Sequence, residues 1–289
     1  MEGRIGIIGG SGFYRVEGIK NVKSVTIKTP FGSPSDAYIT GSLSGQDVVF
    51  LSRHGRGHRI LPAELNYCAN IYGMKKLGVD RIISVSACGS LRKDIRPMDI
   101  VIPDQFVDRT NGARRMTFFG DGIVAHIAFS DPVCPILAKE LYKAGKAVGA
   151  NMHAGGTYIN MEGPQFSTRA ESELYRSWGM DVIGMTNIGE ARVAREAEIC
   201  YATMACVTDY DCWYLDENVE HVSVDLIIQN LLKNVDTSKK ILKKVLPVLP
   251  AERRCLCANA LKDAIMTSPD VMPAKTRKKL KLIIGRYVK

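Results

Sequence analysis

The chain of 289 residues is 46% hydrophobic and 24% charged, which is an ordinary composition for a globular protein. Its formal net charge of +9 is uneven, because residues 252–289 hold ten Lys or Arg against three acidic residues and so carry +7, leaving +2 for the rest. No apolar run approaches the roughly 20 residues of a membrane-spanning helix, and the first residues lack the pattern of a secretory signal. We therefore expect a cytoplasmic protein with no membrane partner.

Short apolar runs rich in Val and Ile alternate with segments whose apolar residues recur three or four positions apart. The runs predict buried strands at residues 5–9, 47–52, 81–86, 99–103, 156–161, 181–185 and 200–208. The other pattern predicts helices at 62–77, 133–148, 167–178, 189–198 and 222–246, with short terminal helices at 256–265 and 274–284. This alternation predicts an α/β fold in which helices flank a largely parallel or mixed central sheet.

One domain is expected, because neither a linker nor a break in composition precedes residue 247. Residues 1–246 would form this domain, and residues 247–289 a basic extension packed on it or at a subunit interface. A nucleic-acid-binding surface usually interleaves aromatic and basic residues. The extension has one aromatic residue after position 252, Tyr287, so we expect no nucleic-acid partner.

Small and polar residues follow four of the predicted strands. Gly10 and Ser11 follow the first, Arg53 and His54 the second, Ser86 and Ala87 the third, and Thr186 the strand that ends at residue 185. Ligands of α/β sheets gather beyond the carboxyl ends of strands. Hydroxyls, free amides and an arginine are the donors that a phosphate dianion requires. The pattern predicts an oxyanion site, although each segment alone is also typical of a turn.

Asp209 and Asp211 close the last predicted strand. Alternate residues of a strand point the same way, so the two carboxylates would lie side by side. Two close carboxylates do not both ionise readily, so one should keep its proton to a higher pH than a free aspartate. The pair could therefore bind hydrogen-bond donors and supply a proton to a leaving group. The alternative is a solvated turn.

The chain resembles the trimeric purine nucleoside phosphorylases from about residue 4 to residue 246. The resemblance rests on GIIGGSG at 6–12, RHGRGH at 53–58, NY and AN at 66–67 and 69–70, SACGSL at 86–91, EGPQFSTRAE at 162–171 and TDYD at 208–211, in order and at the spacing of the family. It implies a homo-oligomer, either a trimer or a hexamer, with inorganic phosphate as co-substrate and a small-molecule nucleoside as substrate.

The resemblance assigns roles to individual residues. The positions matched to phosphate binding are Ser11, Arg53, His54, Ser86, Ala87 and Thr186. Those matched to nucleoside contacts are Phe166, Met185, Asp209, Tyr210, Asp211 and His126, the last of which would reach the site of a neighbouring subunit. Asp209 would face purine N7 as donor or general acid, and Asp211 would hold a 6-amino group, so these two are the candidate catalytic residues.

The implied reaction is phosphorolysis of 5'-methylthioadenosine to adenine and 5-methylthioribose 1-phosphate, a pentosyl transfer that serves purine and methionine salvage. Substrate class rests on Ser167 and Asp209, where 6-oxopurine relatives have glutamate and asparagine, and on Val224, where they have histidine. Val224, Ile227 and Ile228 share one helical face and would contact the methylthio group. The alternatives are a methylthioinosine or general purine nucleoside phosphorylase and, outside enzymes, a nucleotide- or nucleic-acid-binding module.

We expect neither a metal nor an organic cofactor. The histidines at 54, 58, 126, 153 and 221 form no convincing set of ligands. Eight cysteines are scattered along the chain without the paired spacing of a zinc site, and most should be buried small hydrophobic residues. The closely spaced Cys255 and Cys257 are the exception, and we expect them to be free thiols.

Overall fold

The computed structural model describes residues 3–10, 18–214 and 224–288, and within the last range it describes side chains from residue 228 onward. Eleven strands in these residues form one sheet. They are β1 (Arg4–Gly9), β2 (Lys20–Val25), β3 (Tyr38–Leu43), β4 (Gln46–Ser52), β5 (Val79–Ser90), β6 (Ile100–Ile102), β7 (Gln105–Arg109), β8 (Met152–Ala154), β9 (Thr157–Met161), β10 (Val182–Gly184) and β11 (Cys200–Asp209).

The sheet is mixed and branches at β5. The main path runs β2-β3-β4-β1-β5-β10-β9-β7, while β11 pairs with β5 and β6, and β8 pairs with β6. Strands β4, β1, β5 and β11 are parallel to one another, so their carboxyl ends meet at one edge. The short β10 runs antiparallel to the end of β5, with Val182 opposite Ser90 and Ile183 opposite Gly89. It therefore brings the residues that follow it to the same edge.

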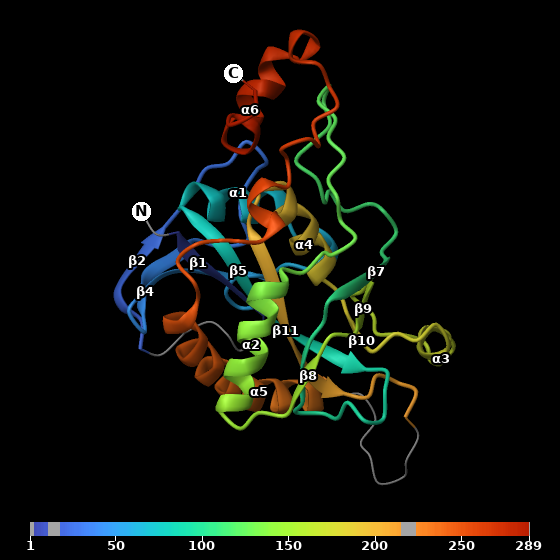
Figure 1. Ribbon diagram of the computed structural model, residues 1–289. Helices are drawn as coiled ribbons and strands as arrows, with labels where there is room; N and C mark the ends of the chain where they lie inside the picture. Colours follow the sequence, from blue (N-terminus) through green and yellow to red (C-terminus); the bar gives the residue numbers. More distant parts are fainter. Residues whose placement is uncertain (1–2, 11–17, 215–223, 289) are drawn as a thin grey trace.

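Helices cover both faces of the sheet (Figure 1). They are α1 (Tyr67–Lys76), α2 (Pro135–Ala147), α3 (Arg169–Ser177), α4 (Asn187–Glu196), α5 (Val224–Val245) and α6 (Ala274–Ile284). Residues of α1, α4 and α6 share one hydrophobic cluster, and residues of α2 and α5 share another on the opposite face. All ten residues of β11 are buried, as expected for a strand covered on both faces.

The predicted α/β architecture is confirmed, and each predicted strand overlaps an observed one. Four strands were not predicted: β2, β3, β7 and β8. Strand β2 is exposed at the sheet edge and carries two lysines, and β8 has only three residues, so neither gives an apolar run. Strand β5 extends to Ser90 because β11 and β10 pair with its final residues. Ser86 and Ala87, expected after this strand, therefore lie within it.

The C-terminal extension packs against the body of the molecule. Leu280, Ile283 and Ile284 of α6 lie in the same hydrophobic cluster as Phe118 and Phe119. The helix predicted at 256–265 is wrong beyond its start, because only a short 3-10 helix at Leu256–Asn259 forms there. Ala125 and Ile265 form an isolated β-bridge that ties the extension to the segment before α2. The expected role of residues 247–289 at a subunit interface stays a prediction.

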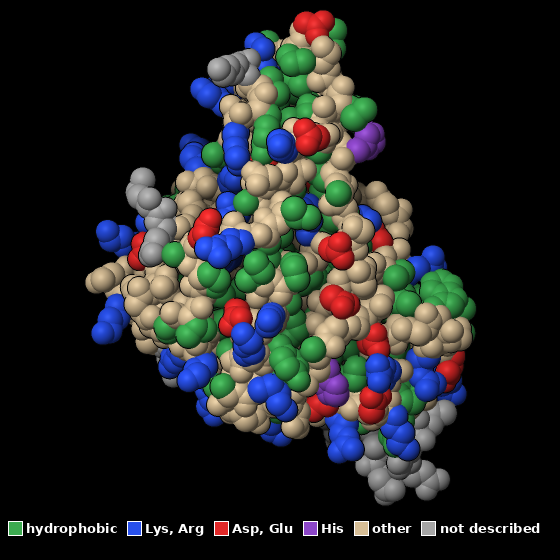
Figure 2. Space-filling view, viewed as in Figure 1, with side chains coloured by type: hydrophobic (Ala, Val, Ile, Leu, Met, Phe, Trp, Pro, Cys, Tyr) green, Lys and Arg blue, Asp and Glu red, His purple; other side chains and the backbone are tan. Residues whose placement is uncertain are grey.

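Basic side chains are dispersed on the face seen in Figure 2, where Lys and Arg alternate with acidic, hydrophobic and other side chains. The view is the same as in Figure 1, so α6 lies at the top, in the part that also carries several basic side chains. Among the helices that the structure describes, none has the length and apolar character needed to cross a bilayer.

Candidate active site

Backbone pairing brings three of the predicted oxyanion segments together. Gly9 lies opposite Ser52 on one side and Val85 on the other. The N–H of Arg53 donates to the carbonyl of Gly9 (2.9 Å), and the N–H of Gly10 donates to the carbonyl of Val85 (3.2 Å). The segments that start at Gly10, Arg53 and Ser86 are thus neighbours. Met185 and Thr186 follow β10 toward Ala87 and Ser86.

Arg53 is a buried cation held by a buried carboxylate. Its side chain is 2% exposed, and its Nε donates to Glu190 Oε1 at 2.5 Å. Its Nη2 donates to Glu190 Oε2 (3.3 Å) and to the hydroxyl of Ser84 (2.6 Å). Glu190 Oε2 also accepts from the hydroxyls of Ser84 (2.8 Å) and Tyr201 (2.9 Å). These hydrogen bonds compensate the burial of both charges and fix the direction of the guanidinium.

One N–H group of Arg53 remains for a ligand after these bonds. A guanidinium has five N–H donors; four of them meet Glu190, Ser84 and the carbonyl of Val85, the last at 3.1 Å from Nη1. The second hydrogen of Nη1 has no acceptor among the described residues, which do not include residues 11–17. A Cβ atom at Gly10 would lie only 3.1 Å from Nη1. The glycine thus keeps an approach to this donor open.

His54 is a neutral ring at this edge. Burial, with a further contribution from the Arg53 cation, lowers its pKa to about 3. Its Nδ1 lies 2.8 Å from the carbonyl of Ile60, which can only accept, so Nδ1 carries the hydrogen. Nε2 is then an acceptor. His54 can therefore accept a hydrogen bond from an O–H group, such as that of a monohydrogen phosphate, without adding positive charge.

Ser86, Ala87 and Thr186 are the other predicted oxyanion donors. Thr186 is the N-cap residue of α4, and its side chain makes no capping hydrogen bond to the helix. The start of α4 therefore offers backbone N–H groups and a hydroxyl, which together favour an anion. Ser86 is buried, and its hydroxyl makes one long hydrogen bond to the carbonyl of Ala87 (3.3 Å).

The two aspartates lie together, but not for the reason that the sequence suggested. Strand β11 ends at Asp209, its pairing with β5 is irregular between Val207 and Asp209, and Asp211 lies in the following turn at φ 51°. Asp209 Oδ1 accepts from the N–H of Asp211 at 2.8 Å, so a tight turn positions the second carboxyl group. A Cβ atom at Gly89 would lie 3.0 Å from Asp209 Oδ1 and 3.3 Å from Asp211 Cβ. This glycine leaves room for both.

Asp209 holds its proton more tightly than a free aspartate. Burial is the main cause, and the charge of Asp211 adds to it, so the pKa of Asp209 is raised to about 6. The hydroxyl of Thr208 opposes this by donating to Oδ2 at 2.7 Å. Burial also raises the pKa of Asp211, while the neighbouring hydroxyls of Ser172 and Ser167 lower it. The pair therefore consists of two buried carboxyl groups whose pKa values are both raised.

Ser167 and Phe166 precede α3, beside the aspartates. Thr168 and Glu171 form a capping box at the start of α3, with Thr168 Oγ1 accepting from the N–H of Glu171 at 3.2 Å. The cap fixes the chain direction just after Ser167, whose carbonyl accepts from the Cys212 thiol at 3.3 Å. The predicted aromatic, Phe166, is 45% exposed in the chain on its own.

The sequence did not single out Arg114, which links the two segments expected to contact a nucleoside. This buried arginine pairs with Glu162 (3.0 Å), donates to the backbone carbonyl of the same residue, and donates to the carbonyl of Met185 at 2.5 Å. Glu162 opens the motif that leads to Phe166, so Arg114 sets the distance between this motif and Met185. No local pattern marks this role, because the partners lie 48 and 71 positions away in the chain.

For the remaining predicted site residues, the structure shows no side-chain contact with Asp209 or Asp211 among the described residues. The hydroxyl of Tyr210 donates to the carbonyl of Lys93 (3.3 Å), and its ring packs against Trp213 and Tyr214. His126 is exposed, and its N–H donates to the carbonyl of Ala264 in the extension (2.8 Å). Ser11 and the side chains of Val224 and Ile227 lie outside the described residues. Ile228, in the first turns of α5, is 46% exposed.

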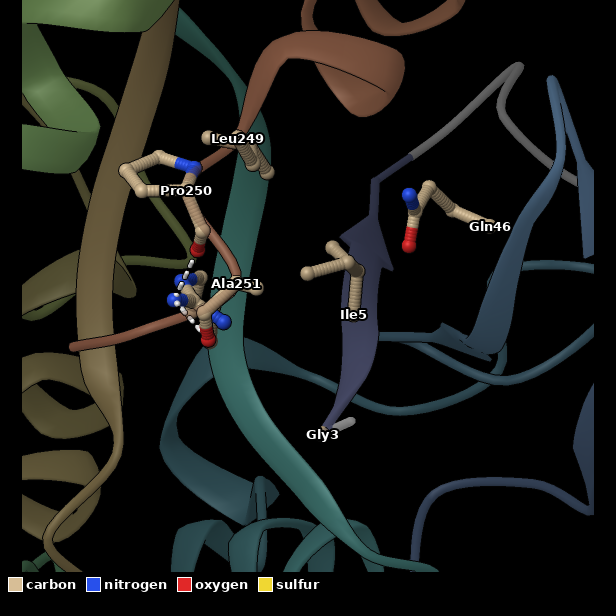
Figure 3. A pocket seen from close by; sticks show the side chains of 7 residues that line it. Gly3, Ile5, Gln46, Leu249, Pro250 and Ala251 are labelled. Carbon is tan, nitrogen blue, oxygen red and sulfur yellow. Dashed lines mark hydrogen bonds between the residues drawn. The ribbon is translucent and has the colours of Figure 1, made fainter. Parts of the chain in front are cut away.

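A separate pocket lies at the opposite edge of the sheet (Figure 3). Gly3 and Ile5 at the start of β1 and Gln46 at the start of β4 line it, together with Arg81 and residues 249–251. The dashed lines in Figure 3 mark two hydrogen bonds of Arg81, whose Nη2 donates to the carbonyls of Pro250 (2.6 Å) and Ala251 (3.4 Å). This pocket holds the start of the extension and has none of the predicted site residues.

A candidate oxyanion site at the same sheet edge as a buried acid suits enzymes that attack a sugar carbon with an anion while a proton stabilises the departing group. Residues 4–247 match the model of the Phosphorylase superfamily, and the chain belongs to that family. Two bacterial proteins named S-methyl-5'-thioadenosine phosphorylase, from Geobacter sulfurreducens and Koribacter versatilis, are 60% and 58% identical to it. The first alignment covers 100% of both chains, and the second covers 99% of this chain and 97% of the relative.

Solved structures agree with this placement. A methylthioadenosine phosphorylase from an antarctic soil metagenomic library is 48% identical with a TM-score of 0.91, covering 98% of this chain and 99% of that one. Methylthioadenosine phosphorylase from Schistosoma mansoni, solved in complex with adenine, is 34% identical with a TM-score of 0.83, covering 98% of each chain. The resemblance to nucleoside phosphorylases that the motifs predicted is confirmed.

Proposed function

We propose that this chain catalyses the phosphorolysis of 5'-methylthioadenosine, giving adenine and 5-methylthioribose 1-phosphate. It is then a pentosyltransferase of purine and methionine salvage. The observation that carries the proposal is the buried Asp209, with a pKa raised to about 6, at the sheet edge where Arg53 and the start of α4 lie. The relatives whose names specify this reaction match the chain over its full length.

The chemistry follows from where charge develops. Breaking the N-glycosidic bond leaves positive charge on the ribose and negative charge on the purine. Phosphate, held by Arg53, Ser86 and Thr186, attacks C1' and forms the new C–O bond as the C–N bond breaks. The electron pair of that bond moves into the purine, and Asp209 donates its hydrogen bond or proton to N7. Asp211 accepts a hydrogen bond from the 6-amino group.

The carboxyl pair favours adenine over hypoxanthine and guanine. An ionised carboxylate can only accept hydrogen bonds, so Asp211 pairs with a 6-amino group but opposes a 6-carbonyl. An unmatched buried polar group costs about 1–3 kcal/mol, equivalent to roughly a 5- to 150-fold loss. A 6-oxopurine has a ring N–H group that needs a hydrogen-bond acceptor, and 6-oxopurine relatives have a glutamate at the position of Ser167. Ser167, which lies beside Asp211, has no carboxylate to fill that role. These features support methylthioadenosine over methylthioinosine as substrate.

Three further elements belong to the proposal. Val224, Ile227 and Ile228 would contact the methylthio group, as the sequence predicts; of these three, the structure describes the side chain of Ile228 alone. His126 would reach the site of a neighbouring subunit in a homotrimer or homohexamer; it is exposed and its backbone N–H donates to Ala264 in the extension, which is compatible with that role. Phosphate is the co-substrate, and the reaction itself uses no metal or organic cofactor. The cytoplasmic location expected from the sequence stays a prediction.

A panel of four nucleosides tests the proposed function. Purified protein is assayed with 5'-methylthioadenosine, adenosine, 5'-methylthioinosine and inosine, each with and without inorganic phosphate. We expect kcat/KM to be highest for methylthioadenosine, to be lower by about tenfold or more for methylthioinosine, and to vanish without phosphate. Faster cleavage of the inosine compounds, or cleavage that does not depend on phosphate, would show that the assignment is wrong.

A further inference from the structure

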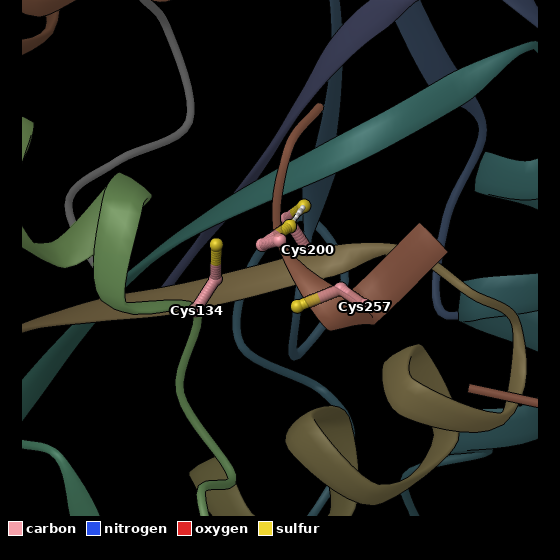
Figure 4. Close-up of side chains that lie close together, drawn as sticks. Cys134, Cys200 and Cys257 are labelled. Atoms are coloured by element: carbon pink, nitrogen blue, oxygen red, sulfur yellow. Dashed lines mark hydrogen bonds between the residues drawn. The ribbon is translucent and has the colours of Figure 1, made fainter. Parts of the chain in front are cut away.

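Four cysteines from distant parts of the chain meet at one place (Figure 4). Cys134 directly precedes α2, and Cys200 is the first residue of β11. Cys255 and Cys257 lie in the extension, at the start of the 3-10 helix Leu256–Asn259. Their four sulfur atoms all lie within 4.8 Å of one another, and Cys200 Sγ is 3.3 Å from Cys255 Sγ. All four are free thiols; three are buried and Cys255 is half-buried. Among the described residues, this is the one group of three or more potential metal ligands.

We propose that these four cysteines bind one zinc ion. Zinc in structural sites takes four ligands at the corners of a tetrahedron, with Zn–S distances of about 2.3 Å, so its sulfurs lie about 3.8 Å apart. Sulfurs already gathered within 4.8 Å reach this spacing through small side-chain rotations. Four thiolates with no other donor are typical of a soft thiophilic ion and not of Mg²⁺ or Ca²⁺.

The surroundings suit bound thiolates. Cys134 is the N-cap residue of α2, so its sulfur lies at the N-terminus of that helix, and its side chain makes no capping hydrogen bond there. A helix N-terminus stabilises negative sulfur. Arg81 and Arg253 line the same small pocket as Cys134, Cys200 and Cys255, together with Glu252. Both arginines pair with Asp80 (3.0 and 3.4 Å), so they offset only part of the net −2 of a zinc ion with four thiolates.

The zinc ion has a structural role. Cys200 begins β11 and Asp209 ends it, so the cluster lies roughly 30 Å from the catalytic carboxyl at about 3.3 Å per residue. The ion instead joins the extension to α2 and β11. Next to it, Arg81 donates to the carbonyl of Pro250 (2.6 Å) and Arg253 to that of Glu198 (2.6 Å). Farther along, the extension pairs with the segment that carries His126. Binding of zinc therefore stabilises the fold of residues 247–289.

Metal analysis of the full-length protein tests the proposal. The protein is purified without added metal under reducing, oxygen-free conditions, and its zinc content is measured by mass spectrometry. We expect close to one zinc per chain. The double variant Cys255→Ser/Cys257→Ser should contain almost none and should melt several degrees lower, because zinc stabilises only the folded state. Cys68→Ser, which removes a buried thiol of α1 outside the cluster, should keep its zinc.

A cobalt titration of the unaltered chain keeps the proposal testable if the double variant does not fold. Zinc is removed with a chelator and Co²⁺ is added; four thiolates should give intense sulfur-to-cobalt charge-transfer bands and the visible bands of a tetrahedral ion. Zinc should then displace the cobalt and abolish these bands. The proposal is overturned if the reduced protein stays free of zinc after incubation with ZnCl₂. It is also overturned if the four cysteines form two disulfides in the purified protein. Mass spectrometry of the intact chain would then give a mass lower by four hydrogens than that of the fully reduced chain.

Discussion

Asp209→Asn should lower kcat for 5'-methylthioadenosine by about a hundred- to a thousandfold, within the range expected for loss of a general acid. The amide can donate a hydrogen bond to purine N7 but cannot transfer a proton. The same change gives the site a donor for a 6-carbonyl, so the preference for methylthioadenosine over methylthioinosine should fall by about tenfold. Steady-state kinetics with both nucleosides at saturating phosphate measures both effects. Asp47→Asn, an exposed residue at the opposite edge of the sheet, should change neither.

The pH dependence of the same variant identifies the proton. The pKa of Asp209 is raised to about 6, so the protonated form dominates below that pH and is lost as the pH rises through it. Bound phosphate adds negative charge nearby and moves this pKa further upward. In the unaltered enzyme, kcat/KM for methylthioadenosine should fall at pH values above this pKa. Asp209→Asn should lack this decline, and a decline that persists in the variant would assign the proton to another group.

Glu190→Ala should lower the free energy of unfolding by about 3–5 kcal/mol, because it leaves the Arg53 guanidinium buried without its counter-charge. Both side chains are almost fully buried, at 2% and 3% exposed. Urea unfolding measures the change. Glu173→Ala removes a surface pair with Arg176 in α3, and such a pair contributes less than about 1 kcal/mol. If both variants lose the same free energy of unfolding, the buried ion pair with Arg53 is not the cause of the loss at Glu190.

Glu190→Gln distinguishes a positioning role from a purely structural one. Glutamine keeps the size of the side chain but offers only one oxygen to Arg53, Ser84 and Tyr201, so the guanidinium is held less firmly. We expect KM for phosphate to rise more than KM for methylthioadenosine, since Arg53 is the phosphate ligand in the proposed mechanism. Equal changes in the two KM values, with stability reduced, would mean that Glu190 serves the fold alone.

The strand ends were predictable from the sequence because the signals there are local. Buried parallel strands appear as apolar runs, and the residue after each run lies at the ligand-binding edge. This reasoning placed Gly10, Arg53 and Thr186 at the same edge, where the structure has them. It also marked Asp209 as the end of β11. The strand β2 was missed because its exposed lysines leave no apolar pattern.

The partners of these residues could not be predicted in the same way. Glu190 lies 137 positions from Arg53, and an isolated glutamate in a helix gives no sign of the arginine it faces. Asp211 was placed on a strand face by alternation, whereas a turn at positive φ carries it. Zinc sites are recognised in a sequence by closely spaced pairs of ligands. Cys134 and Cys200 have no such partner nearby in the chain, so the sequence gives no sign that they meet Cys255 and Cys257. Each of these features depends on contacts between remote segments.

The most direct measurement of the central claim is a crystal structure of the protein with adenine and phosphate bound. We predict adenine with N7 in hydrogen-bonding distance of the Asp209 carboxyl group and its 6-amino group on Asp211, and phosphate against Arg53 and the start of α4. A base bound elsewhere, with both carboxyl groups facing solvent, would contradict the account.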